Sequence, residues 1–235
     1  MSAADPAAQD AATQAPAVPD AAALPGPVRL YTQMQAPNPQ RVAMFVAEKG
    51  IELQQVSIDL MAGDHKAEAY RAKVGTAQVP ALELEDGTVL TETVAICRYL
   101  EALVPEPNLM GRTPYETVVI EMWQRRVELG LFVAVAQCFR HTNKHLAVLE
   151  DQVPEWGEIN RGRIDGHLRM LDARLAERDW LAADRMTIAD MTAFLAFGFR
   201  RIIKHPTPEG VPHLEAWALR MAETRAGQAL ARRPR

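Results

Sequence analysis

Apolar and polar positions along the first hundred residues follow two short strand patterns with a helical pattern between them. Residues 28–32 (VRLYT) form a short strand pattern, and in residues 52–60 (ELQQVSIDL) every second position from Val56 onward is apolar. The segment between them places apolar residues on one helical face and ends at Gly50, a residue suited to closing a helix. Strand, helix and strand in this order predict a right-handed βαβ unit. The residues of the helical face are Val42, Phe45 and Val46.

A hairpin and a further helix are predicted after a polar stretch. Residues 79–92 (VPALELEDGTVLTE) read as two strands joined by a turn at Asp86-Gly87. The segment LTETVAICRYLE (residues 90–101) has one apolar helical face, which runs on to Leu103. Its first polar residues, Glu92 and Thr93, either cap the helix or bind a ligand. The apolar face consists of Ile96, Tyr99, Leu100 and Leu103.

The second half of the chain has helical patterns and no convincing strand. Prolines and a glycine make residues 105–114 a plausible linker. The helix that follows carries one cation, Arg126, on its apolar face, where it either reaches the rim or points into a cleft. Farther along, Thr187 and Asp190 have the spacing of a capping box with Asp in place of Glu. The face that holds Arg126 consists of Val119, Met122, Trp123, Arg126, Val127, Gly130 and Leu131.

Composition and charge narrow the possible functions. The 235 residues are 48% apolar and carry a net charge of −4, so a core can be buried and a nucleic-acid footprint is disfavoured. Cys97 and Cys138 form no CxxC motif, which fits a reduced compartment and two buried packing residues. No apolar run reaches membrane-spanning length, and residues 1–27, rich in Ala and Pro, are expected to be a disordered tail. The histidines lack metal-ligand spacing apart from the loose His141/His145 pair, so no metal is expected.

Four segments together resemble motifs of the glutathione transferase superfamily. LMAGDHKAEAY, QVPALEL, TETVAICRYLE and TIADM occur in that family's order and at its spacing, over about residues 28–225. The segment PNPQRV is similar to the phi- and nu-like branches. The resemblance implies an α+β N-terminal thioredoxin-like domain (β-α-β-α-β-β-α) followed by an all-α C-terminal bundle domain. The expected bounds are 28–104 for the first domain, 105–114 for the linker and 115–235 for the second domain.

The resemblance also implies how the first domain would bind glutathione. Glu92 would pair with the γ-glutamyl ammonium, and the Thr93 hydroxyl with the free helix amides would bind the carboxylate. Pro80, which its pattern alone would leave trans, is cis by resemblance, and the backbone of Val79 would pair with the cysteinyl part. Gln78 would be a further contact. His65 and Lys66 match the pair that reaches the glycine carboxylate, the alternative being a solvated loop.

The group that activates the thiol is the point where the chain departs from the family. Ala36 occupies the usual Ser, Thr or Cys position and has neither hydroxyl nor thiol. Tyr31 lies in the first strand, away from the position of tyrosine-type enzymes. Asn38 is the best remaining candidate, with Gln35 and Gln33 as further amide donors. Asn38 before Pro39 is equally an N-cap followed by a first helical proline. An active site built from amide donors and the helix dipole is therefore predicted.

The resemblance implies a cytosolic, homodimeric enzyme that uses glutathione as co-substrate, without nucleic-acid or membrane partners. The glutathione thiolate would attack a hydrophobic electrophile held near Trp123, Arg126 or Phe132. Core packing is the alternative role for Trp123 and Phe132. Two other functions stay open: glutathione-dependent reduction of peroxides or disulfides, and a non-catalytic binding module.

Overall fold

The first domain is a small mixed sheet with helices on both faces. The structure, a computed structural model, describes residues 28–231, so the expected disordered tail over residues 1–27 lies outside the described residues. The strands are β1 (Arg29–Thr32), β2 (Gln54–Ser57), β3 (Ala81–Glu83) and β4 (Val89–Leu90), in the order β2-β1-β3-β4. Strand β2 is parallel to β1, whereas β3 is antiparallel to both β1 and β4.

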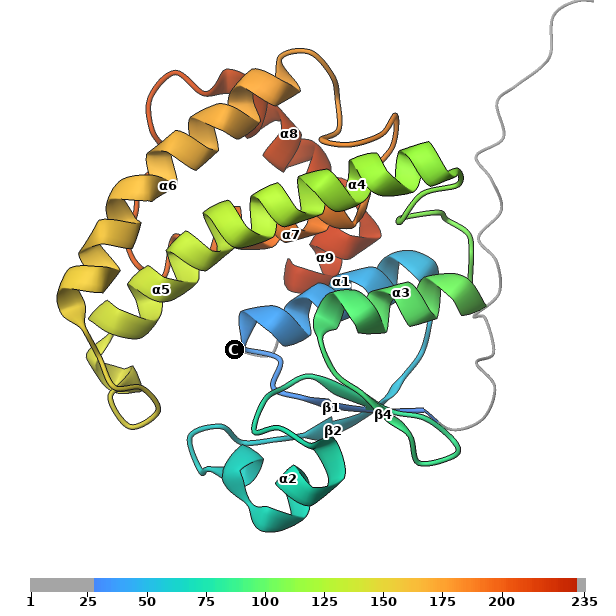
Figure 1. The fold of residues 1–235 in the computed structure, drawn as a ribbon. Coiled ribbons are helices and arrows are strands. Elements are labelled where there is room, and N and C mark those ends of the chain that lie inside the picture. Colours follow the sequence, from blue (N-terminus) through green and yellow to red (C-terminus); the bar gives the residue numbers. More distant parts are fainter. Residues whose placement is uncertain (1–27, 232–235) are drawn as a thin grey trace, which may run out of the picture.

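Three helices complete this domain and confirm the predicted order. Helices α1 (Pro37–Lys49) and α3 (Thr93–Leu103) lie together on one face of the sheet. The 3-10 turn η1 (Asp64–Lys66) and α2 (Glu68–Val74) lie on the opposite face (Figure 1). The Asp86-Gly87 turn is confirmed: Gly87 has φ 82°, and the Thr88 N–H donates to the Asp86 carboxylate at 2.8 Å. Leu103 is 36% exposed, so its predicted place on the apolar face is wrong, and Cys97 is fully buried instead.

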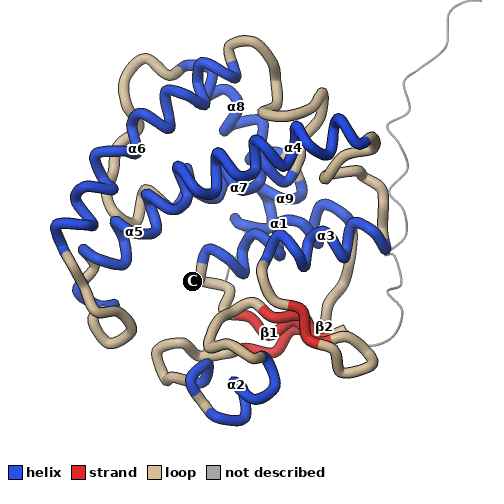
Figure 2. Tube along the Cα trace, viewed as in Figure 1, coloured by secondary structure: helices blue, strands red, loops and turns tan. Residues whose placement is uncertain are grey.

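The second domain is helical, and within the described residues 28–231 the strands are confined to the first domain (Figure 2). Helix α4 (Pro114–Arg126), the π-helical segment η2 (Val127–Phe132) and α5 (Val133–Thr142) follow one another as one long helix (Figure 1). The 3-10 turn η3 (Lys144–Leu146) leads to α6 (Pro154–Leu175), which packs on α5. Helix α7 (Ile188–Phe199) lies behind α4, and α8 (Pro212–Glu223) and α9 (Arg225–Ala231) end the described chain. Together with the first domain, this confirms the predicted fold class.

One apolar core runs through both domains. Leu30 and Phe45 of the first domain belong to the same buried cluster as Leu131 and Leu195 of the second. Helix α9 packs directly on α1, where the Ala226 N–H donates to the Glu48 carboxylate at 2.9 Å. Burial of these shared side chains fixes the second domain against the helix that leads out of the sheet.

The predicted capping box begins α7. The buried Asp190 carboxylate accepts from the Thr187 N–H at 3.0 Å, which confirms the box with Asp in place of Glu. It also accepts from the Leu181 N–H at 3.0 Å and from the Trp217 indole at 3.1 Å. Because every bond goes to one carboxylate, the box ties α7 to α8 and to the loop before it.

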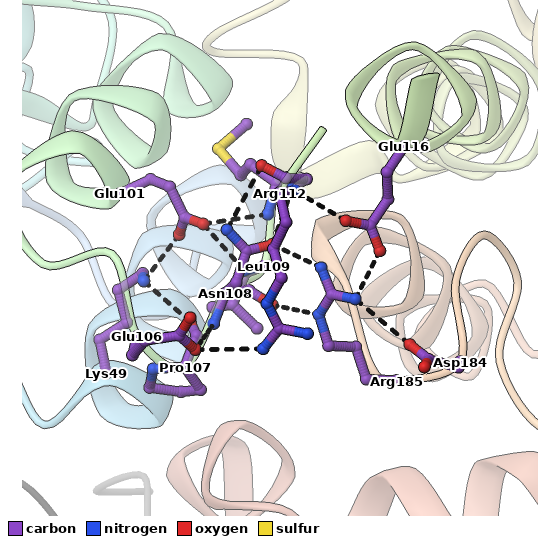
Figure 3. Close-up of polar contacts among 12 residues, drawn as sticks. Lys49, Glu101, Glu106, Pro107, Asn108, Leu109, Arg112, Glu116, Asp184 and Arg185 are labelled. Atoms are coloured by element: carbon purple, nitrogen blue, oxygen red, sulfur yellow. Dashed lines mark hydrogen bonds and ion pairs between the residues drawn. The ribbon is translucent and has the colours of Figure 1, made fainter. Parts of the chain in front are cut away.

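Buried polar groups hold the segment between the domains (Figure 3). The Lys49 ammonium, inaccessible to solvent, pairs with Glu101 at 2.6 Å and donates to the Val104 carbonyl at 2.6 Å. It also donates to the carbonyl of Pro107 at 2.9 Å. Arg185, just before α7, donates to Asn108 in the segment and to Glu116 in α4. Residues 104–113 are therefore held from both domains.

Candidate functional site

The turn into α3 holds a strained glutamate that does not cap its helix. Glu92 has φ 65°, occupies the N-cap position and makes no side-chain capping bond. A non-glycine residue in this region costs about 1–3 kcal/mol, and such residues cluster at functional sites. The reading of Glu92 as an ordinary side-chain cap is therefore wrong. Its exposed carboxylate and the first-turn N–H groups of α3 are left for a ligand.

Thr93, the next residue, is buried against an arginine from α1. The Arg41 guanidinium donates through Nη1 to the Thr93 hydroxyl oxygen at 2.6 Å and to the Glu128 carboxylate at 2.6 Å. Because the Thr93 oxygen accepts from Arg41, its own O–H proton is available for an acceptor on a ligand. Sequence reasoning missed Arg41 and Glu128, although a lone arginine among the apolar positions of α1 was a usable signal.

An open groove of about 750 Å³ leads to this turn from outside. Glu92 and Thr93 line it from α3, and Arg125, Glu128 and Leu129 line it from the second domain. Both domains therefore form the walls beside the strained turn.

The loop before β3 presents the predicted cis-proline. The Val79–Pro80 peptide is cis, as the resemblance implies. The Tyr70 hydroxyl, which sequence reasoning did not single out, donates to the Gln78 carbonyl at 2.6 Å. Burial raises the pKa of Tyr70 to about 12, so its hydroxyl stays protonated and keeps this bond. The Gln78 side chain is exposed.

The predicted pair at the far side of the sheet divides into a buried and an exposed residue. His65 is buried, and this burial lowers the pKa of its imidazole. Its Nδ1 has no hydrogen-bond partner within residues 28–231. Lys66 is exposed and lines a hollow of about 540 Å³ together with Arg71. The solvated-loop alternative therefore does not describe His65.

The start of α1 differs from the prediction for Asn38. The N-cap is Ala36 and the helix begins at Pro37, so Asn38 lies inside the first turn with an exposed side chain. Its reading as an N-cap is wrong, because Pro37 is already preorganised for the first helical position. Pro37 and Pro39 have no N–H, which leaves few backbone donors at this helix start.

The structure also gives the positions of the other polar side chains around the start of α1. Gln35 is exposed and Gln33 is half-buried, so Asn38 and Gln35 reach solvent from the same loop. The Gln40 amide donates to the Met34 carbonyl at 2.9 Å and orders this loop. The Tyr31 hydroxyl donates to Glu83 at 2.6 Å, an interaction within the sheet.

The three residues predicted to hold an electrophile lie in different surroundings. Phe132 is buried under the Arg41 guanidinium, 5.0 Å from its ring centre, and so adjoins the Thr93 turn. Trp123 is buried, with the guanidinium groups of Arg126 and Arg174 at 5.0 Å and 4.9 Å from its ring centre. Arg126 is exposed.

The two cysteines are buried and pack inside the protein. Cys97 is fully buried, and its burial raises the pKa of the thiol to about 12. Burial also raises the pKa of Cys138. Within residues 28–231, no group of three His, Cys, Asp or Glu side chains could hold a metal ion. Across the same residues, no helix combines the length and the apolar character needed to span a membrane.

Comparison with known proteins gives a consistent result for both domains. The glutathione S-transferase N-terminal domain matches residues 36–103, and the C-terminal domain of the same family matches residues 135–224. Glutathione S-transferase 2 of Saccharomyces cerevisiae is 36% identical over 198 residues, which cover 83% of this chain and 85% of that protein. GstA of Escherichia coli O157:H7 is 31% identical over 181 residues, with 75% and 84% covered. The crystal structure of Gtt2 from Saccharomyces cerevisiae superposes with a TM-score of 0.80 at 35% identity, covering 86% of this chain and 99% of that one.

Proposed function

Because the chain belongs to the glutathione S-transferase family, we propose that it binds glutathione and activates its thiol for attack on a hydrophobic electrophile. The observation that carries this proposal is the turn at Glu92 and Thr93. There a strained backbone leaves a carboxylate, a hydroxyl and uncapped helix amides at the mouth of the groove. These groups match the ammonium and the carboxylate of a γ-glutamyl end.

The rest of the tripeptide would follow the edge of the sheet. The backbone of Val79, before the cis-Pro80, would pair with the cysteinyl unit in the manner of an added strand. Lys66 would pair with the glycine carboxylate, and His65 and Gln78 would supply further hydrogen bonds.

Thiol activation would depend on amide donors, because Ala36 supplies neither hydroxyl nor thiol. The free thiol has a pKa of about 8.5, and donors at a helix start lower it. Asn38 and Gln35 are the exposed amides at this helix start. The electrophile would then lie against the second domain near Phe132, with Trp123 and Arg126 as outlying contacts.

Ala36 also favours a second candidate function. Without a hydroxyl beside the sulfur, glutathione-dependent reduction of a peroxide or of a mixed disulfide is the alternative chemistry. A non-catalytic glutathione-binding module would share the same binding residues.

We also propose a cytoplasmic homodimer with a role in detoxification. The exposed face of the long second-domain helix supports self-association, because its apolar side chains recur three, four and seven residues apart. The mutation Leu129→Glu should shift the sedimentation coefficient from dimer to monomer, and an unchanged value would refute this face as the contact. The apolar residues are Tyr115, Val118, Met122 and Leu129.

Two measurements test the function. Calorimetry with reduced glutathione tests binding, and absence of heat at millimolar concentration would overturn the proposal. A substrate panel of chloronitrobenzene, cumene hydroperoxide and a glutathione mixed disulfide separates transferase from reductase chemistry. Turnover of the chloronitrobenzene alone supports the transferase, turnover of the other two supports the reductase, and binding without turnover supports the module.

A further inference from the structure

A charged pair lies buried between the two domains, directly behind the Thr93 hydroxyl. Arg41 is 1% exposed, and its Nε and Nη2 atoms have no hydrogen-bond partner within residues 28–231. Its one ion-pair partner in that part of the chain, Glu128, comes from η2 of the second domain. Burying a guanidinium with unpaired N–H groups costs free energy that an apolar residue would not, so packing alone does not account for Arg41.

The charge around Arg41 is only partly neutralised. The Glu128 carboxylate is shared, since it accepts from Arg41 at 2.6 Å and from Arg125 at 2.9 Å. Arg125 and Arg98 also share the Glu121 carboxylate, so three guanidinium groups meet two carboxylates on this side of the groove. The side of Arg41 that faces Thr93 is where a further negative charge would be stabilised.

The π-helical turn gives Arg41 its second-domain neighbours. Glu128 and Phe132 both belong to η2, and the carboxylate of one and the ring of the other contact the same guanidinium. π-Turns inside α-helices occur frequently at functional sites. Here the turn places the Glu128 carboxylate of the second domain against Arg41, the same side chain that contacts Thr93.

We propose that Arg41 and Glu128 are positioning residues for the γ-glutamyl carboxylate of glutathione. Arg41 occupies the acceptor side of the Thr93 oxygen, so the hydroxyl proton is directed to the ligand, and Glu128 holds Arg41 in that orientation. The second domain thereby sets affinity at a site formed by the first domain. This inference rests on the proposed function, because it requires that the chain binds glutathione.

The test compares three ligands by calorimetry on wild type and Glu128→Gln. Glutathione carries both the α-ammonium and the α-carboxylate, glutaryl-cysteinylglycine lacks the ammonium, and γ-aminobutyryl-cysteinylglycine lacks the carboxylate. Glu128→Gln should weaken binding of the two carboxylate-bearing ligands by roughly 5- to 20-fold. It should leave γ-aminobutyryl-cysteinylglycine within about twofold of its wild-type affinity, because that ligand has no group for Thr93 to bind.

Two further variants separate positioning from general damage. Thr93→Val removes the hydroxyl that accepts from Arg41 but leaves the Arg41–Glu128 ion pair in place, and it should show the same ligand discrimination. The double variant should add little to either single loss. Glu121→Gln is the control, because Glu121 pairs with Arg98 and Arg125 but not with Arg41, and all three affinities should be unchanged.

Each outcome has a distinct meaning. An equal loss for all three ligands, or no loss for glutathione, in a folded Glu128→Gln protein would overturn the positioning role while leaving glutathione binding intact. If Glu128→Gln does not fold, the Thr93→Val discrimination decides, and an equal loss there overturns the role. If calorimetry detects no heat when glutathione is added to the wild type, the proposed function itself is contradicted.

Discussion

At the scale of single residues, the start of α1 is where the proposed function requires the pKa of the glutathione thiol to be lowered. Ala36 caps the helix without a side-chain bond, and two prolines remove N–H donors from its first turn. The exposed Asn38 amide lies within that turn, and the exposed Gln35 amide lies in the loop just before it. Thiol activation is therefore a question about these two amides.

Replacing Asn38 by Ala tests this directly. If the amide donates to the sulfur, the pKa of bound glutathione should rise by about 1 unit, equivalent to about 1.4 kcal/mol of lost thiolate stabilisation. Ultraviolet absorbance of the thiolate, followed across pH for wild type and variant, measures the change. Gln35→Ala compares the second amide of the same loop. An unchanged pKa in the Asn38 variant would remove Asn38 from the mechanism.

Individual residues could be predicted from the sequence only where a local motif carries them. Glu92 and Thr93 precede an apolar helical face, and Val79-Pro80 precedes a strand, so their positions follow from neighbours in the chain. Arg41 and Glu128 lie far apart in the sequence, and their contact appears only when the two domains pack. No local pattern around either residue encodes that pairing.

At the scale of secondary-structure elements, the helix patterns were predicted well and their irregularities were not. The apolar face that includes Trp123, Val127 and Leu131 indicated one continuous helix. The structure instead inserts the π-helical segment η2 at residues 127–132. A widened turn keeps almost the same apolar spacing, so periodicity alone could not distinguish it from regular helix.

Gly130 has no side chain, and this allows η2 to lie close to α6. A Cβ atom built at Gly130 would lie 2.7 Å from the His167 ring, so Gly130→Ala must displace that ring. We expect the free energy of unfolding to fall by about 1–3 kcal/mol, measured by urea denaturation. Gly162→Ala in α6 is the matched control, since nothing lies within 4 Å of the added methyl. That variant should gain about 0.5–1 kcal/mol from helix propensity, and an equal effect of both substitutions would contradict the close approach.

At the scale of the whole molecule, the division into two domains could be predicted from the sequence, because a strand-rich pattern changes to a helical one. The segment between them was predicted as a linker from its prolines and glycine, which report local backbone preference only. Its anchoring depends on Lys49, Asn108 and Arg185, which belong to distant parts of the chain (Figure 3). Such a network depends on the finished fold, so sequence composition could not reveal it.

This anchoring predicts a specific acid sensitivity. The Arg185 guanidinium, which donates to the Glu116 carboxylate, lowers the pKa of that carboxyl from 4.5 to about 2. A carboxyl with a depressed folded-state pKa stabilises the fold above its unfolded pKa and loses this contribution as pH falls toward the folded value. Between pH 5 and pH 2 the wild type should therefore lose about 1–2 kcal/mol more than Glu116→Gln, after allowance for solvent screening.

Urea denaturation at pH 5, 4, 3 and 2 measures this difference between wild type and Glu116→Gln. Glu209→Gln, on an exposed loop carboxylate, is the control and should follow the wild-type curve at every pH. If Glu116→Gln also follows that curve, the Arg185–Glu116 pair does not stabilise the fold, and the segment is held by the Lys49 contacts and by the bonds from Arg185 to Asn108. If the difference appears, the pair links α4 to the loop before α7 within the second domain. Because Arg185 also donates to the Asn108 carbonyl, acid should then loosen the hold of the second domain on residues 104–113 before it unfolds either core.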